Sequence, residues 1–78
     1  MKIEILGTGC PNCLKLKKDV ELAILELNLK NVELKKVEEI DKIIAMGVIS
    51  TPALVVDGEV KTSGRLPNLE EIKSYLNE

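Results

Sequence analysis

The sequence predicts a small α/β fold whose elements follow one another in the order β-α-β-α-β-β-α. Three patterns predict it: a long helical stripe of apolar residues after a short first strand, further apolar runs of strand length, and a two-residue hairpin turn late in the chain. The first part should give parallel strands, and the hairpin should add an antiparallel edge. With 78 residues, the chain is expected to form one domain spanning residues 1–78.

The first half of the chain carries a strand, a long helix and a second strand. Ile3 to Leu6 forms the predicted strand, which Gly7-Thr8-Gly9 interrupts. From Pro11 to about Asn28 the pattern is helical, and Pro11 suits the first helical position because its missing N–H is not needed there. A second strand is expected between Asn31 and Val37. The apolar stripe of the helix contains Cys13, Leu16, Val20, Ala23, Ile24 and Leu27.

The second half of the chain contains a short helix, a hairpin and a final helix. Residues 39–46 carry Ile40, Ile43 and Ile44 at helical spacing, and Gly47 is a suitable C-terminal stop. Residues 53–56 form a buried strand, and Asp57-Gly58 turns it into a strand at 59–62. Asn68 and Glu71 form a possible capping box. The helix that this box opens has Leu69, Ile72 and Leu76 on its buried face.

Composition excludes several classes of function. The chain is 45% hydrophobic and 31% charged, with a net charge of −2, which does not fit a basic nucleic-acid or membrane-surface protein. The segment Met1 to Leu6 is too short and too alternating for the apolar core of a signal peptide, and no apolar run is long enough to span a membrane. A cytoplasmic protein with no nucleic-acid or membrane partner is therefore expected.

Two cysteines, Cys10 and Cys13, are the only ones in the chain, and histidine is absent. Two thiols at this spacing can cycle between dithiol and disulfide, or they can bind a thiophilic metal. They cannot form a Cys–His catalytic pair, and alone they cannot complete a tetrahedral zinc site. A purely structural crosslink is the third interpretation, but so short a loop would contribute only about 2 kcal/mol.

The two thiols occupy different positions relative to the predicted helix. Cys10 lies just outside the helix N-terminus, where unpaired N–H groups and a partial positive charge favour a thiolate. Cys13 heads the core-facing stripe. This difference in position indicates a redox pair in which the two thiols have separate roles. A Cu(I) chaperone stays possible, because two thiolates suit Cu(I).

Three segments together resemble the thioredoxin-like superfamily over essentially the whole chain. They are Gly9-Cys10-Pro11-Asn12-Cys13, the run from Gly47 through Thr51-Pro52 to Val56, and Ser63-Gly64 after the hairpin. In size the chain is similar to glutaredoxins and to small archaeal and bacterial redox-active disulfide proteins, and it is identified as a member of the second group. The resemblance implies a minimal thioredoxin fold, with a four-stranded mixed sheet flanked by helices.

The resemblance also implies a function, dithiol–disulfide exchange, in which Cys10 attacks a substrate disulfide and Cys13 resolves the mixed disulfide. It implies a cis Thr51–Pro52 bond and a substrate-binding surface made by Pro11, Asn12, Thr51, Pro52 and Gly64. No cofactor is implied beyond the redox-active Cys10–Cys13 disulfide. The implied partners are disulfide-bearing proteins and a thioredoxin-reductase-type electron donor, with the protein itself a monomer.

Departures from related families refine this interpretation. Glutaredoxins bind glutathione through a Gly-Gly and acidic cluster after the hairpin, whereas this chain has Ser63-Gly64-Arg65-Leu66-Pro67. A thioredoxin-like donor is therefore expected rather than glutathione. Copper-transfer domains with such a cysteine pair have their elements in the order β-α-β-β-α-β, usually with methionine where this chain has Thr8. A segment like Thr51-Pro52 has no role in them.

Two further features have alternative interpretations. Glu4, six residues before Cys10, is either a base that helps to deprotonate Cys13 or a solvated strand residue, and the second is the simpler interpretation. A second apolar patch on the long helix either packs against loops or forms a partner surface. That patch contains Leu14, Leu22, Leu25 and Leu29.

Overall fold

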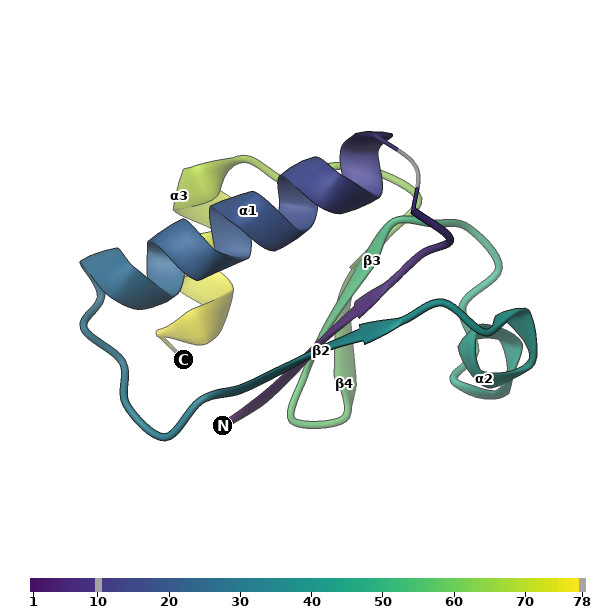
Figure 1. Cartoon of the computed structure of the whole chain (residues 1–78), viewed down its shortest axis with the longest axis horizontal. Coiled ribbons are helices and arrows are strands. Elements are labelled where there is room, and N and C mark those ends of the chain that lie inside the picture. Colours follow the sequence, from purple (N-terminus) through teal and green to yellow (C-terminus); the bar gives the residue numbers. More distant parts are fainter. Residues whose placement is uncertain (10, 78) are drawn as a thin grey trace.

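The computed structural model describes residues 1–9 and 11–77. Within them the elements follow the predicted order (Figure 1). They are β1 (Lys2–Leu6), α1 (Pro11–Glu26), β2 (Glu33–Val37), α2 (Ile40–Ala45), β3 (Ala53–Val56), β4 (Glu59–Ser63) and α3 (Leu69–Leu76). Among the described residues, no helix has the length and apolar character needed to cross a membrane.

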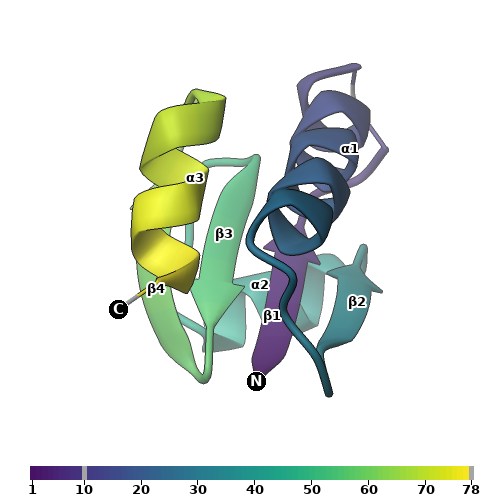
Figure 2. The ribbon, with the colours of Figure 1, turned by 90° about the vertical axis from the view of Figure 1, so that its left-hand side faces the viewer.

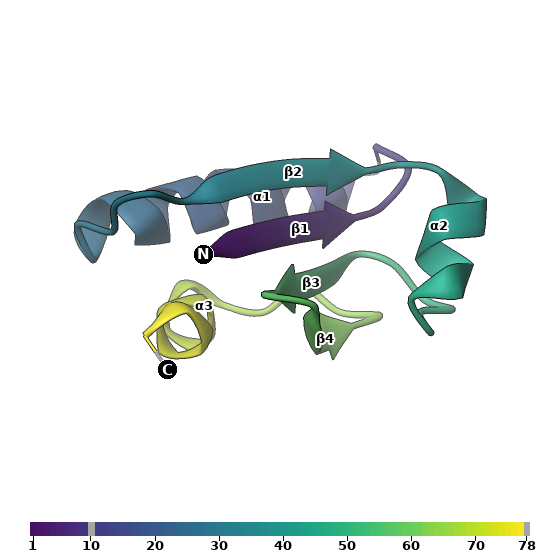
Figure 3. The same cartoon turned by 90° about the horizontal axis from the view of Figure 1, so that it is seen from below.

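The four strands form one mixed sheet in the order β2-β1-β3-β4. β1 and β2 are parallel, as a helical crossover between them requires, while β3 is antiparallel to both β1 and β4. Figure 3 shows this order along the sheet, with α2 beyond the carboxyl ends of β1 and β2. The predicted four-stranded mixed sheet flanked by helices is confirmed.

Alternation along β1 divides the buried residues between the two faces of the sheet. Ile3 and Ile5 point to one face, where α1 and α3 lie side by side (Figure 2). Leu6 points to the other face and packs with Ile43 of α2. The helix α1 contributes its predicted stripe to the first of these cores, and Leu16, Val20 and Ala23 are fully buried there.

Element boundaries differ from the prediction by a few residues, and left-handed backbone conformations explain where some of them fall. α1 ends at Glu26 rather than Asn28, because Asn28 has a φ of 55° that a helix cannot continue. β2 begins at Glu33 rather than Asn31, whose φ is 58°. Gly47, with a φ of 83°, follows α2, and its N–H donates to the carbonyl oxygen of Ile44 at 2.9 Å. It is the stop that the sequence predicted.

The hairpin turn between β3 and β4 has the conformation that its sequence predicts. Asp57 and Gly58 both have positive φ, 50° and 83°, which matches the twist of two antiparallel strands. The pairing of β3 with β4 shifts register between Leu54 and Val55, and β4 extends to Ser63 rather than residue 62. β4 therefore ends directly before Gly64, where the loop that leads to α3 begins.

Candidate active site

The end of β1 and the start of α1 bring together the first part of the candidate site. Cys13 lies in the first turn of α1 and is only 3% exposed, while its neighbours Pro11 and Asn12 are exposed. Cys10 lies outside the described residues, so its role stays a prediction. Since Cys13 belongs to the buried stripe of α1, packing of that helix on the sheet fixes the position of its side chain.

Gly7 is the meeting point of Cys13 and Thr51. A Cβ atom placed on Gly7 would lie 3.1 Å from Cβ of Cys13 and 3.9 Å from Cβ of Thr51. The two side chains therefore approach the same backbone position from segments that lie almost forty residues apart in the sequence. Cys13 therefore lies beside the loop that contains Thr51 and Pro52.

The loop before β3 carries Thr51 and Pro52. Their peptide bond is cis, as the resemblance implied, and Thr51 is exposed whereas Pro52 is buried. The N–H of Gly64 donates to the carbonyl oxygen of Pro52 at 3.0 Å. Gly64 also approaches Ser50 so closely that a Cβ added to it would lie 3.0 Å from Cβ of Ser50. Gly64 therefore packs directly against the loop that contains Thr51 and Pro52.

An apolar pocket of about 320 Å³ adjoins this loop. Three of its isoleucines are strongly exposed: Ile49 at 94%, Ile40 at 60% and Ile44 at 59%. Thr8 and Thr51 border the pocket beside the cysteine segment, and its complete lining is Thr8, Ile40, Ile43, Ile44, Val48, Ile49 and Thr51. An exposed apolar pocket at a loop of this kind offers a surface to another polypeptide.

The sequence pattern alone does not identify Ile40, Ile44 and Ile49 as surface residues. The helical spacing of Ile40, Ile43 and Ile44 is equally compatible with burial, and only the packing shows that Ile43 alone of these three is buried. The available signal was the length of α2, which has six residues. A helix with fewer than two full turns has little room to bury three isoleucines against one sheet.

Comparison with known proteins places the chain in a family. A family model described as "Thioredoxin domain" matches residues 1–77. The chain belongs to the thioredoxin family. A protein named thioredoxin from Methanothermobacter thermautotrophicus is 46% identical over 77 residues, covering 99% of both chains. Another so named, from Methanocaldococcus jannaschii, is 38% identical over 74 residues, which cover 95% of this chain and 84% of that protein.

Membership of the thioredoxin family agrees with the order of the elements and weighs against a copper chaperone. The observed order, β-α-β-α-β-β-α, differs from the β-α-β-β-α-β order expected of copper-transfer domains. Across residues 1–9 and 11–77, no three His, Cys, Asp or Glu side chains cluster in a way that could hold a metal ion. Neither finding favours the metal-binding alternative.

Glu4 and the second patch on α1 can now be placed in this thioredoxin-like fold. Glu4 is half-buried on the sheet face that it shares with Leu6, opposite to α1, and its part in catalysis stays a prediction. In the patch, Leu14, Leu22 and Leu25 are exposed, whereas Leu29 packs against the core. A partner surface on this face also stays a prediction.

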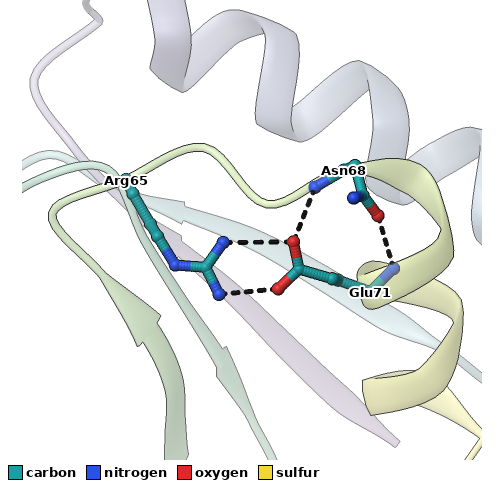
Figure 4. Close-up of polar contacts among 3 residues, drawn as sticks. All are labelled: Arg65, Asn68 and Glu71. Atoms are coloured by element: carbon teal, nitrogen blue, oxygen red, sulfur yellow. Dashed lines mark hydrogen bonds and ion pairs between the residues drawn. The ribbon is translucent and has the colours of Figure 1, made fainter.

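A polar cluster holds the segment that leads from Gly64 to α3 (Figure 4). The guanidinium of Arg65 donates two hydrogen bonds to the carboxylate of Glu71, at 3.1 and 2.6 Å. The predicted capping box is present: Asn68 Oδ1 accepts from the N–H of Glu71 at 2.9 Å, and the N–H of Asn68 donates to Glu71 at 3.4 Å. The sequence predicted the cap but not the arginine, because Arg65 lies outside the capping pattern.

Replacing Glu71 with glutamine should lower stability at neutral pH, and the difference from the wild type should shrink in acid. The hydrogen bonds from Arg65, followed by the one from the Asn68 backbone, lower the pKa of Glu71 below its ordinary value of 4.5. A lowered folded-state pKa gives stability that is present above the unfolded-state pKa and is lost as pH falls through the folded-state pKa. Urea unfolding midpoints at several pH values below and above 4.5 would measure this.

The control is Glu70→Gln, which removes a carboxylate from the same helical turn without breaking the Arg65 pair. If the Glu70 and Glu71 variants showed the same pH dependence, the effect would come from net charge and not from the Arg65 cluster.

Proposed function

We propose that this protein is a dithiol–disulfide oxidoreductase that reduces disulfide bonds in other proteins through Cys10 and Cys13. The observation that carries the proposal is the placement of Cys13, buried at the start of α1 and adjacent to the exposed Thr51. A thiol in that position is shielded from bulky substrates, yet it can react with a sulfur held by the residue three positions earlier. Membership of the thioredoxin family supports the same chemistry.

The proposed reaction has two exchange steps. The thiolate of Cys10 attacks one sulfur of the substrate disulfide, the substrate S–S bond breaks, and the other substrate sulfur leaves as a thiolate. Cys13 then loses its proton and attacks the sulfur of Cys10, which forms the Cys10–Cys13 disulfide and releases the second substrate thiolate. The substrate gains two electrons and two protons, and the cysteine pair is oxidised.

The exposed loop and the apolar pocket provide the surface on which a substrate polypeptide would bind. Thr51 and Pro52, with Gly64 hydrogen-bonded to Pro52, would offer backbone groups to the substrate, and the exposed Pro11 and Asn12 would contact it from the start of α1. The pocket lined by Ile40, Ile44 and Ile49 would receive an apolar side chain of the substrate. We include these residues in the proposed substrate-binding surface.

Replacing Ile49 with serine should lower kcat/KM for a protein disulfide such as that of insulin about five- to tenfold. This is the effect expected when one apolar anchor worth roughly 1 to 1.4 kcal/mol is lost from an interface. Reduction of a small aromatic disulfide should be unchanged, because it does not reach the pocket. Since Ile49 is 94% exposed, the substitution should leave folding stability nearly unchanged.

The matched control is Val60→Thr, at a 39% exposed apolar residue of β4 that is not part of the pocket. Equal losses in the Ile49 and Val60 variants, or an equal loss with the small disulfide, would show that the pocket does not bind the substrate.

The proposal includes one domain, a cytoplasmic location, a monomeric state and a reductase as electron donor. Of these features, the identity of the electron donor is the one that an experiment can test most directly. Insulin reduction should proceed with NADPH and a thioredoxin reductase, and it should be much slower with glutathione at the same reducing capacity. Faster turnover with glutathione would reassign the donor. If the protein did not accelerate insulin reduction over the protein-free reaction with either donor or with dithiothreitol, the proposed function would be overturned.

A further inference from the structure

Gly7 is a glycine whose backbone does not require glycine. The chain has five glycines, and the other four, Gly9, Gly47, Gly58 and Gly64, have φ values between 77° and 87°, where other residues are strained. Gly7 does not have a positive φ. It is buried, and its position continues the alternation of Ile3 and Ile5 toward the face covered by α1. A different reason must therefore explain the missing side chain.

The reason is the sulfur atom of Cys13, which occupies the space where a side chain of residue 7 would begin. A Cβ atom on Gly7 would come closer to Sγ of Cys13 than the 3.0 Å limit that real Cβ contacts respect, and it would lie 3.1 Å from Cβ of Cys13. The obstacle is thus the reacting atom itself and not a flexible side-chain end.

Other contacts hold both the backbone of Gly7 and the first turn of α1 that carries Cys13. The N–H of Gly7 donates to the carbonyl oxygen of Val37 at 2.9 Å, which ties the end of β1 to β2. Cys13 lies on the same stripe of α1 as Leu16, which is fully buried in the core. A methyl group at position 7 would therefore displace the Cys13 sulfur by changing its side-chain torsion or by lifting the first turn of α1.

We propose that Gly7 is a positioning residue for the resolving step, because its lack of a side chain sets where the Cys13 sulfur lies. This inference rests on the proposed function. In the resolving step the Cys13 thiolate must approach the Cys10 sulfur in line with the bond to the substrate sulfur. The Cys10–substrate bond breaks as the Cys10–Cys13 bond forms, and the electron pair leaves on the substrate sulfur. A displaced Cys13 sulfur slows this step without affecting the first attack.

The test is Gly7→Ala in single-turnover reactions with an aromatic disulfide reagent that releases one coloured thiolate in each of the two exchange steps. The first release, which reports attack by Cys10, should stay within about twofold of the wild type. The second release, which reports resolution by Cys13, should slow about 10- to 100-fold, as expected for a misplaced reacting group. Mass spectrometry should show the mixed disulfide accumulating.

Gly58→Ala is the matched control, because it also adds a methyl group to a glycine but lies in the hairpin, where nothing approaches within 4 Å. Its φ of 83° makes alanine strained there, so it should lower the melting temperature while leaving both thiolate releases unchanged. Wild-type resolution in Gly7→Ala, or slowed resolution in Gly58→Ala, would overturn the inference. If the wild type itself released no thiolate, the proposed function would fail instead.

A second measurement covers the case in which Gly7→Ala does not fold. The double variant Gly7→Ala/Cys13→Ala lacks the sulfur, and it should recover a cooperative unfolding transition that Gly7→Ala alone has lost. Cys13→Ala alone is the reference and should fold. If Gly7→Ala abolished folding in the Cys13→Ala background as it does in the wild type, the sulfur would not be the main obstacle and the inference would be wrong.

Discussion

Cys13→Ser should give a protein that attacks one disulfide and then stops. Without the second thiol the mixed disulfide waits for an external thiol, so multiple turnover should fall on the order of a thousandfold or more, since effective molarities of well-placed groups far exceed thiol concentrations in solution. The trapped species should be visible as a covalent complex on a non-reducing gel. Mass spectrometry of its peptides should place the link at Cys10.

Cys10→Ser is the opposite variant, and it should neither turn over nor trap a partner. The reason is that Cys13, at 3% exposure, is shielded from a protein disulfide by the start of α1 and by the segments that contain Gly7 and Thr51. Equal trapping by the two variants would mean that both thiols reach the substrate, and the separate roles assigned to them would be wrong. Purified protein should also be assayed for copper and zinc before the experiment, so that bound metal does not mask the thiols.

Leu16→Ala should lower the free energy of unfolding by about 2 to 5 kcal/mol, the cost of a cavity in a packed core. Leu16 has no exposed surface and lies in the core cluster between α1 and the sheet. A chain of this length is expected to have a total stability of only about 4 to 12 kcal/mol. The substitution should therefore remove a large fraction of it, and could leave the protein partly unfolded at its working temperature.

Urea unfolding followed by far-ultraviolet circular dichroism is the suitable measurement, since the chain has no tryptophan and a single tyrosine. Leu25→Ala on the same helix is the control, because Leu25 is 76% exposed and its loss should cost less than about 0.5 kcal/mol. A comparable loss in both variants would show that the outer face of α1 is covered in solution, which is the partner surface considered for Leu14, Leu22 and Leu25.

The order of the elements could be predicted from the sequence because each of them leaves a local pattern. The stripe of α1, the Asp57-Gly58 turn and the Asn68–Glu71 box all involve residues within a few positions of one another. Periodicity and turn chemistry act over such distances, so the prediction differed from the structure only by a few residues at element ends. The same locality explains why the sequence indicates only the end of a strand at Gly7-Thr8-Gly9.

Features that depend on contacts between distant segments could not be predicted in this way. The approach of Cys13 and Thr51 to Gly7 is set by how α1 and the loop before β3 pack on the end of β1. The pair between Arg65 and Glu71 and the exposure of Ile40 and Ile44 are likewise results of tertiary packing. The resemblance to a known family supplied the proximity of Thr51-Pro52 to the cysteines, but nothing in it indicated why residue 7 lacks a side chain.

The burial of Cys13 at the head of the α1 stripe has a thermodynamic consequence. In the proposed mechanism, one end of the hydrophobic core is itself a redox-active group, so the oxidised and reduced proteins would not share the same core. Any substitution along the stripe that stabilises one of these forms more than the other must shift the reduction potential, by about 30 mV for each ~1.4 kcal/mol of difference. The reduction potential of the proposed cysteine pair would therefore depend on interior packing as well as on the two residues between the cysteines.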